Sequence, residues 1–192
     1  MPKKQLRLGE LADIRVGYSF RSKIEHDPRG TVAVVQIRDI TGGGELRFDQ
    51  LPCLQWPTAA VPPYLQAGDI ILPARGDHYN AVMAPEGVPV VASSQLFVLT
   101  SRSSAALPEY LCWYLNQPRA QNYFLSSRAG TSIPMLNKQA LGALPVQLPS
   151  LETQHQLLAL QQQWQRERQL TQQLLDNRER MLQGVFAKLL ES

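Results

Sequence analysis

Short apolar runs separated by turn residues occupy the first three quarters of the chain. No run is longer than seven residues, β-branched side chains are frequent in them, and turn residues stand on both sides. Runs of this length and composition are typical of strands rather than helices. We therefore predict strands at 31–37, 69–74, 88–92 and 95–100.

Helical spacing appears in three shorter stretches between these runs. Residues 7–16 place apolar side chains three residues apart, which predicts a helix there. Residues 107–124 begin with a Pro-Glu pair that suits the first helical turn, and Pro118 interrupts the pattern. Residues 137–144 begin with Asn137, a favourable N-cap.

The pattern changes at Ser150. From there to the end the chain has no proline and one glycine, and it is rich in Gln, Leu, Arg and Glu, which favour helices. Ser150 can cap a helix, and Glu152 in the first turn interacts favourably with the helix dipole. We predict one helix over most of 150–192, roughly 60 Å long at about 1.5 Å per residue.

Apolar residues recur along this helix at spacings of three or four. Polar residues at Glu167, Thr171 and Arg178 interrupt the heptad pattern. The first part of the stripe can pack either on the chain's own domain or on another helix. The later part lies far from that domain, and unpaired it would be an exposed apolar patch, so we predict a partner helix there. The proposed pairing residues are Leu157, Leu160, Trp164, Leu174, Met181, Val185 and Leu189.

The distribution of helix-breaking residues divides the chain into two parts. Twelve of the 14 prolines and 11 of the 12 glycines precede Leu144. We therefore predict an α+β, strand-rich globular domain at 1–149 and a long C-terminal α-helix at 150–192.

Composition and charge narrow the functional classes. The chain is 44% apolar and 18% charged, which suits a folded domain. It contains no apolar stretch of about 18 residues and begins without an apolar leader segment, so we expect a cytoplasmic protein without a membrane span.

The net charge of +3 comes entirely from residues 1–149, with 14 basic against 11 acidic residues, because 150–192 holds five of each. This distribution suits a domain that faces DNA.

Catalytic motifs are lacking. Residues 61–64, VPPY, resemble a motif of amino-methyltransferases, but Val61 replaces the polar residue that such chemistry needs. Asp69 and Asp77 are better explained as turn residues than as a nuclease centre, and His78 lacks an evident partner. Cys53 and Cys112 are not spaced like metal ligands, so we expect no metal. Because the catalytic motifs are lacking as well, we expect no cofactor and no intrinsic enzyme activity. The sequence favours a binding module.

Six segments, in order, resemble the specificity (S) subunit of type I restriction–modification systems, in a form with a single target-recognition domain. They are LGELADIRVGYSFRSK, VQIRDIT, LQAGDIILPARG, SSQLFVLTSR, PEYLCWYLNQP and, most specifically, GTSIPMLNKQALGALPVQLPSLETQHQL. The resemblance covers essentially the whole chain.

This resemblance implies a non-catalytic subunit that binds one half of a split site in double-stranded DNA. In that family two long helices pair antiparallel, and the subunit docks methyltransferase (M) subunits, which can recruit the restriction (R) subunit. Full-length members carry two recognition domains and two helices, whereas this chain has one of each. It would therefore homodimerise through its C-terminal helix, pair with a different half-subunit, or be an inactive remnant.

Candidate DNA contacts come from the chemistry of the loops, because the resemblance does not carry base contacts residue by residue. Donors, acceptors and cations beside glycines suit base reading and phosphate binding. For each lone arginine a solvated surface charge is the alternative. The candidates are Tyr18, Ser19, Arg21 and Lys23 in the first loop, Arg75, His78, Tyr79 and Asn80 in the second, and Arg128 and Thr131 in the third. A helical adaptor that binds protein rather than DNA is the alternative function.

Overall fold

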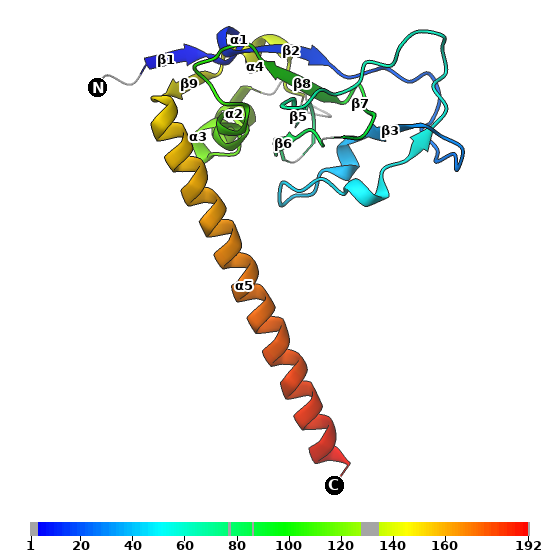
Figure 1. Ribbon diagram of the computed structural model, residues 1–192, viewed down its shortest axis with the longest axis vertical. Helices are drawn as coiled ribbons and strands as arrows, with labels where there is room; N and C mark the ends of the chain where they lie inside the picture. Colours follow the sequence, from blue (N-terminus) through cyan, green and yellow to red (C-terminus); the bar gives the residue numbers. More distant parts are fainter. Residues whose placement is uncertain (1–3, 77, 86, 128–134, 192) are drawn as a thin grey trace. The chain divides into compact units, whose positions relative to one another are not determined.

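The computed structural model describes residues 4–76, 78–85, 87–127 and 135–191 of the 192-residue chain. The chain forms two compact units, Met1–Leu151 and Glu152–Ser192. The first is a mixed domain of short strands and short helices, and the second consists almost entirely of helix α5 (Leu151–Leu190), drawn in Figure 1. The predicted α+β domain followed by a long C-terminal helix is confirmed.

Three small sheets are found among the described residues of the first unit. The largest has four strands in the order β2-β8-β5-β6, and all neighbours in it are antiparallel. A three-stranded sheet has the order β4-β3-β7, with β3 and β7 parallel, and a two-stranded sheet pairs β1 with β9. The strands are β1 (Lys4–Arg7), β2 (Ala12–Val16), β3 (Val32–Val35), β4 (Cys53–Leu54), β5 (Ile70–Pro73), β6 (Val82–Met83), β7 (Val90–Ala92), β8 (Leu96–Ser101) and β9 (Pro145–Leu148).

The short helices form where the sequence supplies start and stop signals. Pro118 separates two of them, as predicted, and Asn137 caps another by accepting a hydrogen bond from the Ala140 N–H at 2.7 Å. The helices are α1 (Leu8–Leu11), α2 (Pro108–Leu115), α3 (Pro118–Ser127) and α4 (Lys138–Ala143), and two 3-10 turns are η1 (Ile37–Asp39) and η2 (Phe48–Gln50).

The four predicted strands are present as β3, β5, β7 and β8, but the helix predicted at 7–16 is wrong beyond Leu11. Residues 12–16 form strand β2, which pairs antiparallel with β8. Ala12 and Ile14 are buried while Asp13 between them is exposed, so this segment follows the two-residue period of a strand. Pairing with β8 outweighed the local helical spacing. Strands β1, β4, β6 and β9 were not predicted.

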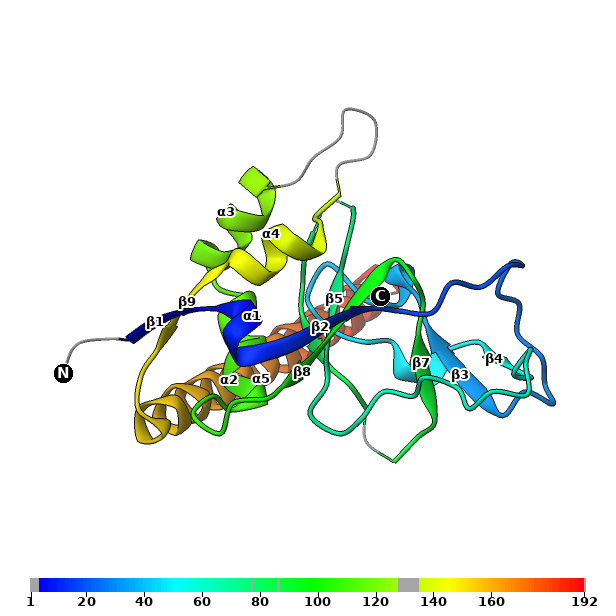
Figure 2. The same ribbon diagram turned by 90° about the horizontal axis from the view of Figure 1, so that it is seen from above.

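The main core cluster is built from strands of the two larger sheets. It gathers buried apolar side chains from β3, β5, β6, β7 and β8, such as Val35, Ile71, Val90 and Val98. In both views, helices α1 to α4 lie toward one end of the domain and the three-stranded sheet toward the other, with the four-stranded sheet between them (Figures 1 and 2). The loop between β2 and β3 leads into the three-stranded sheet, whereas residues 75–80 lie between β5 and β6 of the four-stranded sheet.

Two tyrosines of α2 fasten strand β9, the last strand of the domain. The Tyr110 hydroxyl donates a hydrogen bond to the Gln147 carbonyl, and the Tyr114 hydroxyl donates to the Pro145 carbonyl at 3.0 Å. Burial, with a smaller contribution from Tyr114, raises the pKa of Tyr110 to about 12. Strand β9 is therefore held on one side by β1 and on another by α2.

Candidate nucleic-acid interface

The loop from Gly17 to Gly30 connects β2 with β3 and carries the first group of predicted DNA contacts. Its first end is fastened to the strands beside it, because the Gly17 N–H donates to the Leu96 carbonyl at 2.9 Å and the Tyr18 N–H to the Ala92 carbonyl at 2.7 Å. A β-carbon on Gly17 would lie 2.2 Å from the Ser93 carbonyl oxygen. Only glycine permits so close an approach of the two backbones.

The second end of this loop is fastened to β4. The Asp27 N–H donates to the Cys53 carbonyl at 2.8 Å, and the Cys53 N–H donates to Nδ1 of His26 at 3.2 Å. A β-carbon on Gly30 would lie 2.4 Å from the Leu54 nitrogen, so glycine is required here as well. The loop is thus fixed at both ends while its middle projects from the domain.

Three aromatic rings hold the early part of this loop against the segment that follows β4. The ring of Tyr18 lies 4.9 Å from that of Phe20 and 4.7 Å from that of Trp56, and the Phe20 and Trp56 rings are 6.0 Å apart, centroid to centroid. Tilted and edge-to-face contacts at these distances are favourable. The predicted residue Tyr18 is therefore half-buried in a packing cluster, and its ring anchors the loop.

The other predicted residues of this loop are presented to solvent. Ser19, Arg21 and Lys23 are all exposed. The Lys23 ammonium lies 3.1 Å from the Glu25 carboxylate, but the two side chains are 83% and 70% exposed, so this ion pair is weak. Both cations are accessible to a polyanion.

The second predicted group, at 75–80, does not form one exposed surface. His78 is exposed and Arg75 is half-buried, with its backbone bridged to Met135. Tyr79 is 0% exposed and packs against Phe124 with ring centroids 5.9 Å apart. Its side chain belongs to the core and is not available to DNA, so the prediction that Tyr79 contacts DNA is wrong.

Asn80 holds a neighbouring loop in place. Its side-chain amide donates to the Gly42 carbonyl at 2.8 Å and to the Thr41 carbonyl at 3.3 Å. Such bonds stabilise the Gly-rich segment between η1 and η2, so the amide of Asn80 is occupied within the domain. Of the third predicted group, Arg128 and Thr131 lie outside the described residues.

The 3-10 turn η1 lies beside both loops, and η2 lies beside the first. Arg38 in η1 shares an open groove with Lys23 and Gln50, and Ile37 is 3.8 Å from the β-carbon position of Gly76. Burial raises the pKa of Asp39, opposed by a hydrogen bond from the Gln36 N–H and by the charges of Arg38 and Arg47. In the sequence, the Arg-Asp step at 38–39 was the signal that could have drawn attention to η1.

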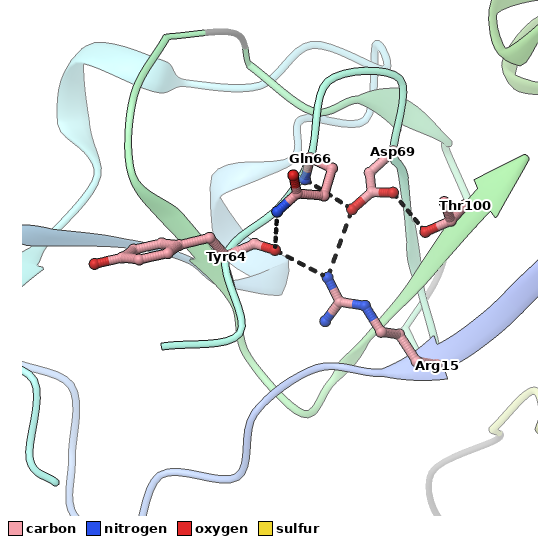
Figure 3. Close-up of polar contacts among 5 residues, drawn as sticks. All are labelled: Arg15, Tyr64, Gln66, Asp69 and Thr100. Carbon is pink, nitrogen blue, oxygen red and sulfur yellow. Dashed lines mark hydrogen bonds and ion pairs between the residues drawn. The ribbon is translucent and has the colours of Figure 1, made fainter. Parts of the chain in front are cut away.

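The contacts of Asp69 are structural, as expected for a turn residue rather than for a nuclease centre. Its carboxylate is buried, accepts from the Thr100 hydroxyl at 2.6 Å and from the Gln66 N–H at 2.9 Å, and lies 3.5 Å from the Arg15 guanidinium (Figure 3). Arg15 also donates to the Tyr64 carbonyl at 3.4 Å. These bonds join the turn before β5 to β2 and β8.

In the described part of the chain, no group of three or more His, Cys, Asp or Glu residues is placed to hold a metal ion.

Helix α5 carries a second candidate surface. Six of the seven predicted pairing residues are exposed apolar side chains, and Leu157 is half-buried. The stripe is wider than predicted, because adjacent apolar pairs recur toward the C-terminus. The additional exposed members are Leu170, Leu175, Leu182, Phe186 and Leu190.

None of the helices in the described residues combines the length and apolar content that a membrane crossing needs.

Comparisons with known proteins identify a family for this chain and solved structures with a similar fold. Residues 2–178 match the family described as Type I restriction modification DNA specificity domain. No curated protein matches the chain in sequence.

Solved structures with a similar fold include an S subunit, an HsdS subunit and a chain from a study of the type I R-M system. The S subunit of the type I restriction-modification system from M. genitalium is 13% identical, with a TM-score of 0.54 over 80% of this chain and 36% of that one. The HsdS subunit from Thermoanaerobacter tengcongensis is 21% identical, with a TM-score of 0.58 over 85% and 37% of the two chains. A chain from a structural study of complex assembly and conformational transition of the type I R-M system is 22% identical, with a TM-score of 0.56 over 85% and 38%. This chain therefore spans less than two fifths of each structure's length.

Proposed function

The chain belongs to the family of type I restriction modification DNA specificity domains, and from this membership we propose that it reads one half of a bipartite DNA site. The resemblance drawn from the sequence is thereby confirmed at the level of the family. In this proposal the first unit binds double-stranded DNA, helix α5 pairs with a second helix, and the assembly directs methyltransferase subunits to the site. The chain itself makes and breaks no bonds.

The loop Gly17–Gly30 is the observation that carries the DNA-reading part of this proposal. Its two ends are hydrogen-bonded to β4, β7 and β8 elements of the scaffold, and Arg21 and Lys23 project from its middle. A loop fixed in this way loses little conformational freedom when it binds, so its contacts contribute more of their energy to affinity. Cations on such a loop suit the phosphate backbone, and neighbouring polar groups suit base edges.

The exposed apolar stripe on α5 supports pairing with a second copy. Leu174, Met181 and Val185 repeat at helical spacing and are each about half exposed or more. Pairing with a second helix removes this apolar surface from water. In a two-fold dimer the same stripe of each copy forms the interface. A two-fold dimer would place two identical recognition domains on DNA and would read an interrupted palindrome.

The width of the stripe supports docking of a further subunit on the same helix. A two-stranded coiled coil needs only a narrow seam of apolar positions. The adjacent pairs Leu174–Leu175, Met181–Leu182 and Val185–Phe186 give a broader face, which is typical of a helix in a bundle. We propose that the surplus face binds the methyltransferase subunits, through which the restriction subunit can join.

Co-expression with the methyltransferase encoded beside the gene tests the proposed function. Methylated bases are mapped across the host genome, with a methyltransferase-only strain as control. An interrupted palindromic motif supports a symmetric dimer of this chain, and a split asymmetric motif means that its partner is a different half-subunit. Absence of any motif, with the chain folded and bound to the methyltransferase, would favour the adaptor or remnant alternatives.

A further inference from the structure

An open groove of about 570 Å³ lies between the Gly17–Gly30 loop and the two 3-10 turns. One wall comes from the end of the loop and the other from η1 and η2. The polar side chains that line it are Lys23, Glu25, His26, Arg38, Asp49 and Gln50. The groove therefore joins one predicted DNA-contacting residue, Lys23, to five polar residues that are not among the predicted DNA contacts.

The backbone that carries Arg38 is rigidly held. Within η1, the Asp39 carboxylate accepts from the Gln36 N–H at 2.8 Å, and the Asp39 N–H donates to the Gln36 carbonyl at 3.0 Å. The Asp39 carbonyl in turn accepts from the Arg47 N–H at 2.9 Å, which ties η1 to the strand-like segment before η2. A side chain on such a support is positioned before any ligand arrives.

The guanidinium of Arg38 is held far less tightly than its backbone. Its side chain is 66% exposed, and Nε lies 3.8 Å from the Asp39 carboxylate, beyond the length of a charge-assisted hydrogen bond. An ion pair this long and this exposed contributes little to stability. The guanidinium is therefore free to donate two parallel hydrogen bonds to a ligand at little energetic cost to the fold.

The charges in the groove favour base edges over phosphates. A surface that follows only the phosphate backbone gains from cations and is repelled by carboxylates, yet Glu25 and Asp49 lie in the same walls as Lys23 and Arg38. Base edges present both donors and acceptors, so a mixed set of side chains is complementary to them. The carboxylate of Asp49 suits an exocyclic amino group, and the amide of Gln50 suits adenine.

We propose that this groove reads base edges and that Arg38 is a specificity-determining residue that recognises guanine in one base pair of the half-site. The inference rests on the proposed function and assigns the reading to particular residues. Arginine is suited to this role because its planar fork donates simultaneously to O6 and N7 of guanine. Lys23, at the rim of the same groove, would contact the adjacent phosphate.

The test uses the full chain in complex with its methyltransferase. DNA duplexes bound from a randomised pool give the preferred motif, and competition with single base-pair variants then measures discrimination at each position. Two variants, Arg38→Ala and Arg38→Lys, are compared with Arg29→Ala, which removes an exposed cation of the Gly17–Gly30 loop that does not line the groove. We expect both Arg38 variants to lose discrimination at one G·C pair by about 5- to 150-fold and to keep the other positions. Arg29→Ala should keep the whole motif.

The possible outcomes separate this inference from the proposed function. If the wild-type complex selects no motif, the proposed function fails. If it selects a motif and Arg38→Ala selects the same motif with the same discrimination, the role of Arg38 is overturned. A loss of affinity that is equal for every DNA sequence would mean that Arg38 contacts phosphate or supports the fold, whether or not Arg38→Lys restores the affinity. This outcome would also overturn the role of Arg38.

Discussion

The buried carboxylate of Asp69, just before β5, lies 3.5 Å from the guanidinium of Arg15 on β2, although strand β8 separates β5 from β2 in the sheet. The same carboxylate accepts hydrogen bonds from Thr100 on β8 and from the backbone of Gln66. One side chain thus joins a turn and two strands around the start of β5. A buried charge that is satisfied in this way is stabilising only as long as its partners stay in place.

We expect Asp69→Asn to lower the free energy of unfolding by about 1.5–3 kcal/mol, because the amide replaces a charged acceptor and turns an N–H toward one of the three donors. Urea unfolding followed by circular dichroism measures the change. Asp13→Asn is the matched control, since Asp13 pairs with Arg102 at 2.9 Å at the surface, and we expect a change below about 0.5 kcal/mol. Equal effects of the two substitutions would contradict the structural role of Asp69.

Gly17→Ala should destabilise the domain by about 1–3 kcal/mol, because the new methyl group would meet the backbone of Ala92 and Ser93 and force the loop away from β7. Gly42→Ala is the control, since its β-carbon would meet no atom within 4 Å. Thermal unfolding of the two variants gives the comparison. A stable Gly17→Ala protein with wild-type DNA binding would show that the loop is not fastened at this end.

Stability should decline in alkaline solution, in part through Cys112. Burial, with a smaller contribution from Glu109, raises the pKa of this thiol from 9.0 to about 12. The folded state therefore keeps a proton that the unfolded state releases, so this contribution to stability is complete below pH 9 and is lost as the pH rises toward 12. Urea unfolding at a series of pH values should show a shallower decline for Cys112→Ala than for the wild type. Parallel declines would contradict this assignment. Tyr110, whose pKa is also raised, should leave a residual decline in the variant.

Leu174→Lys combined with Met181→Lys should dissociate the proposed dimer, because both side chains are exposed apolar members of the stripe on α5 and a charge there would have to be desolvated on pairing. Sedimentation velocity of the full chain measures the state. Gln173→Lys, on the polar side of the same helix, should leave the wild-type species unchanged. If the double variant sediments like the wild type, the stripe is not the pairing surface.

Lys23→Ala should weaken binding to all DNA sequences alike and make the plot of log affinity against log salt less steep by about one, as expected for the loss of one phosphate contact. Titrations between 50 and 200 mM salt measure this slope. Lys138→Ala, on α4, removes one exposed lysine elsewhere and should leave the slope unchanged. A wild-type affinity without salt dependence would instead favour the protein-binding adaptor.

Local patterns were sufficient for much of the architecture. The apolar runs at β3, β5, β7 and β8 and the proline-free tract of α5 could be read directly, because strand and helix periodicity depend on neighbouring residues in the chain. The exposed stripe on α5 followed from the same periodicity, although its full width did not. Family membership followed from short motifs in a fixed order.

Contacts between distant segments decided the rest. Residues 12–16 became a strand because β8 pairs with them, and Tyr79 became a core residue because Phe124 packs on it. The loop Gly17–Gly30 is fixed by β4, which lies more than twenty residues away in the chain, and the groove containing Arg38 forms only where this loop meets η1 and η2. Burial and the closeness of side chains depend on how the whole domain packs, so they appear only when the chain is folded.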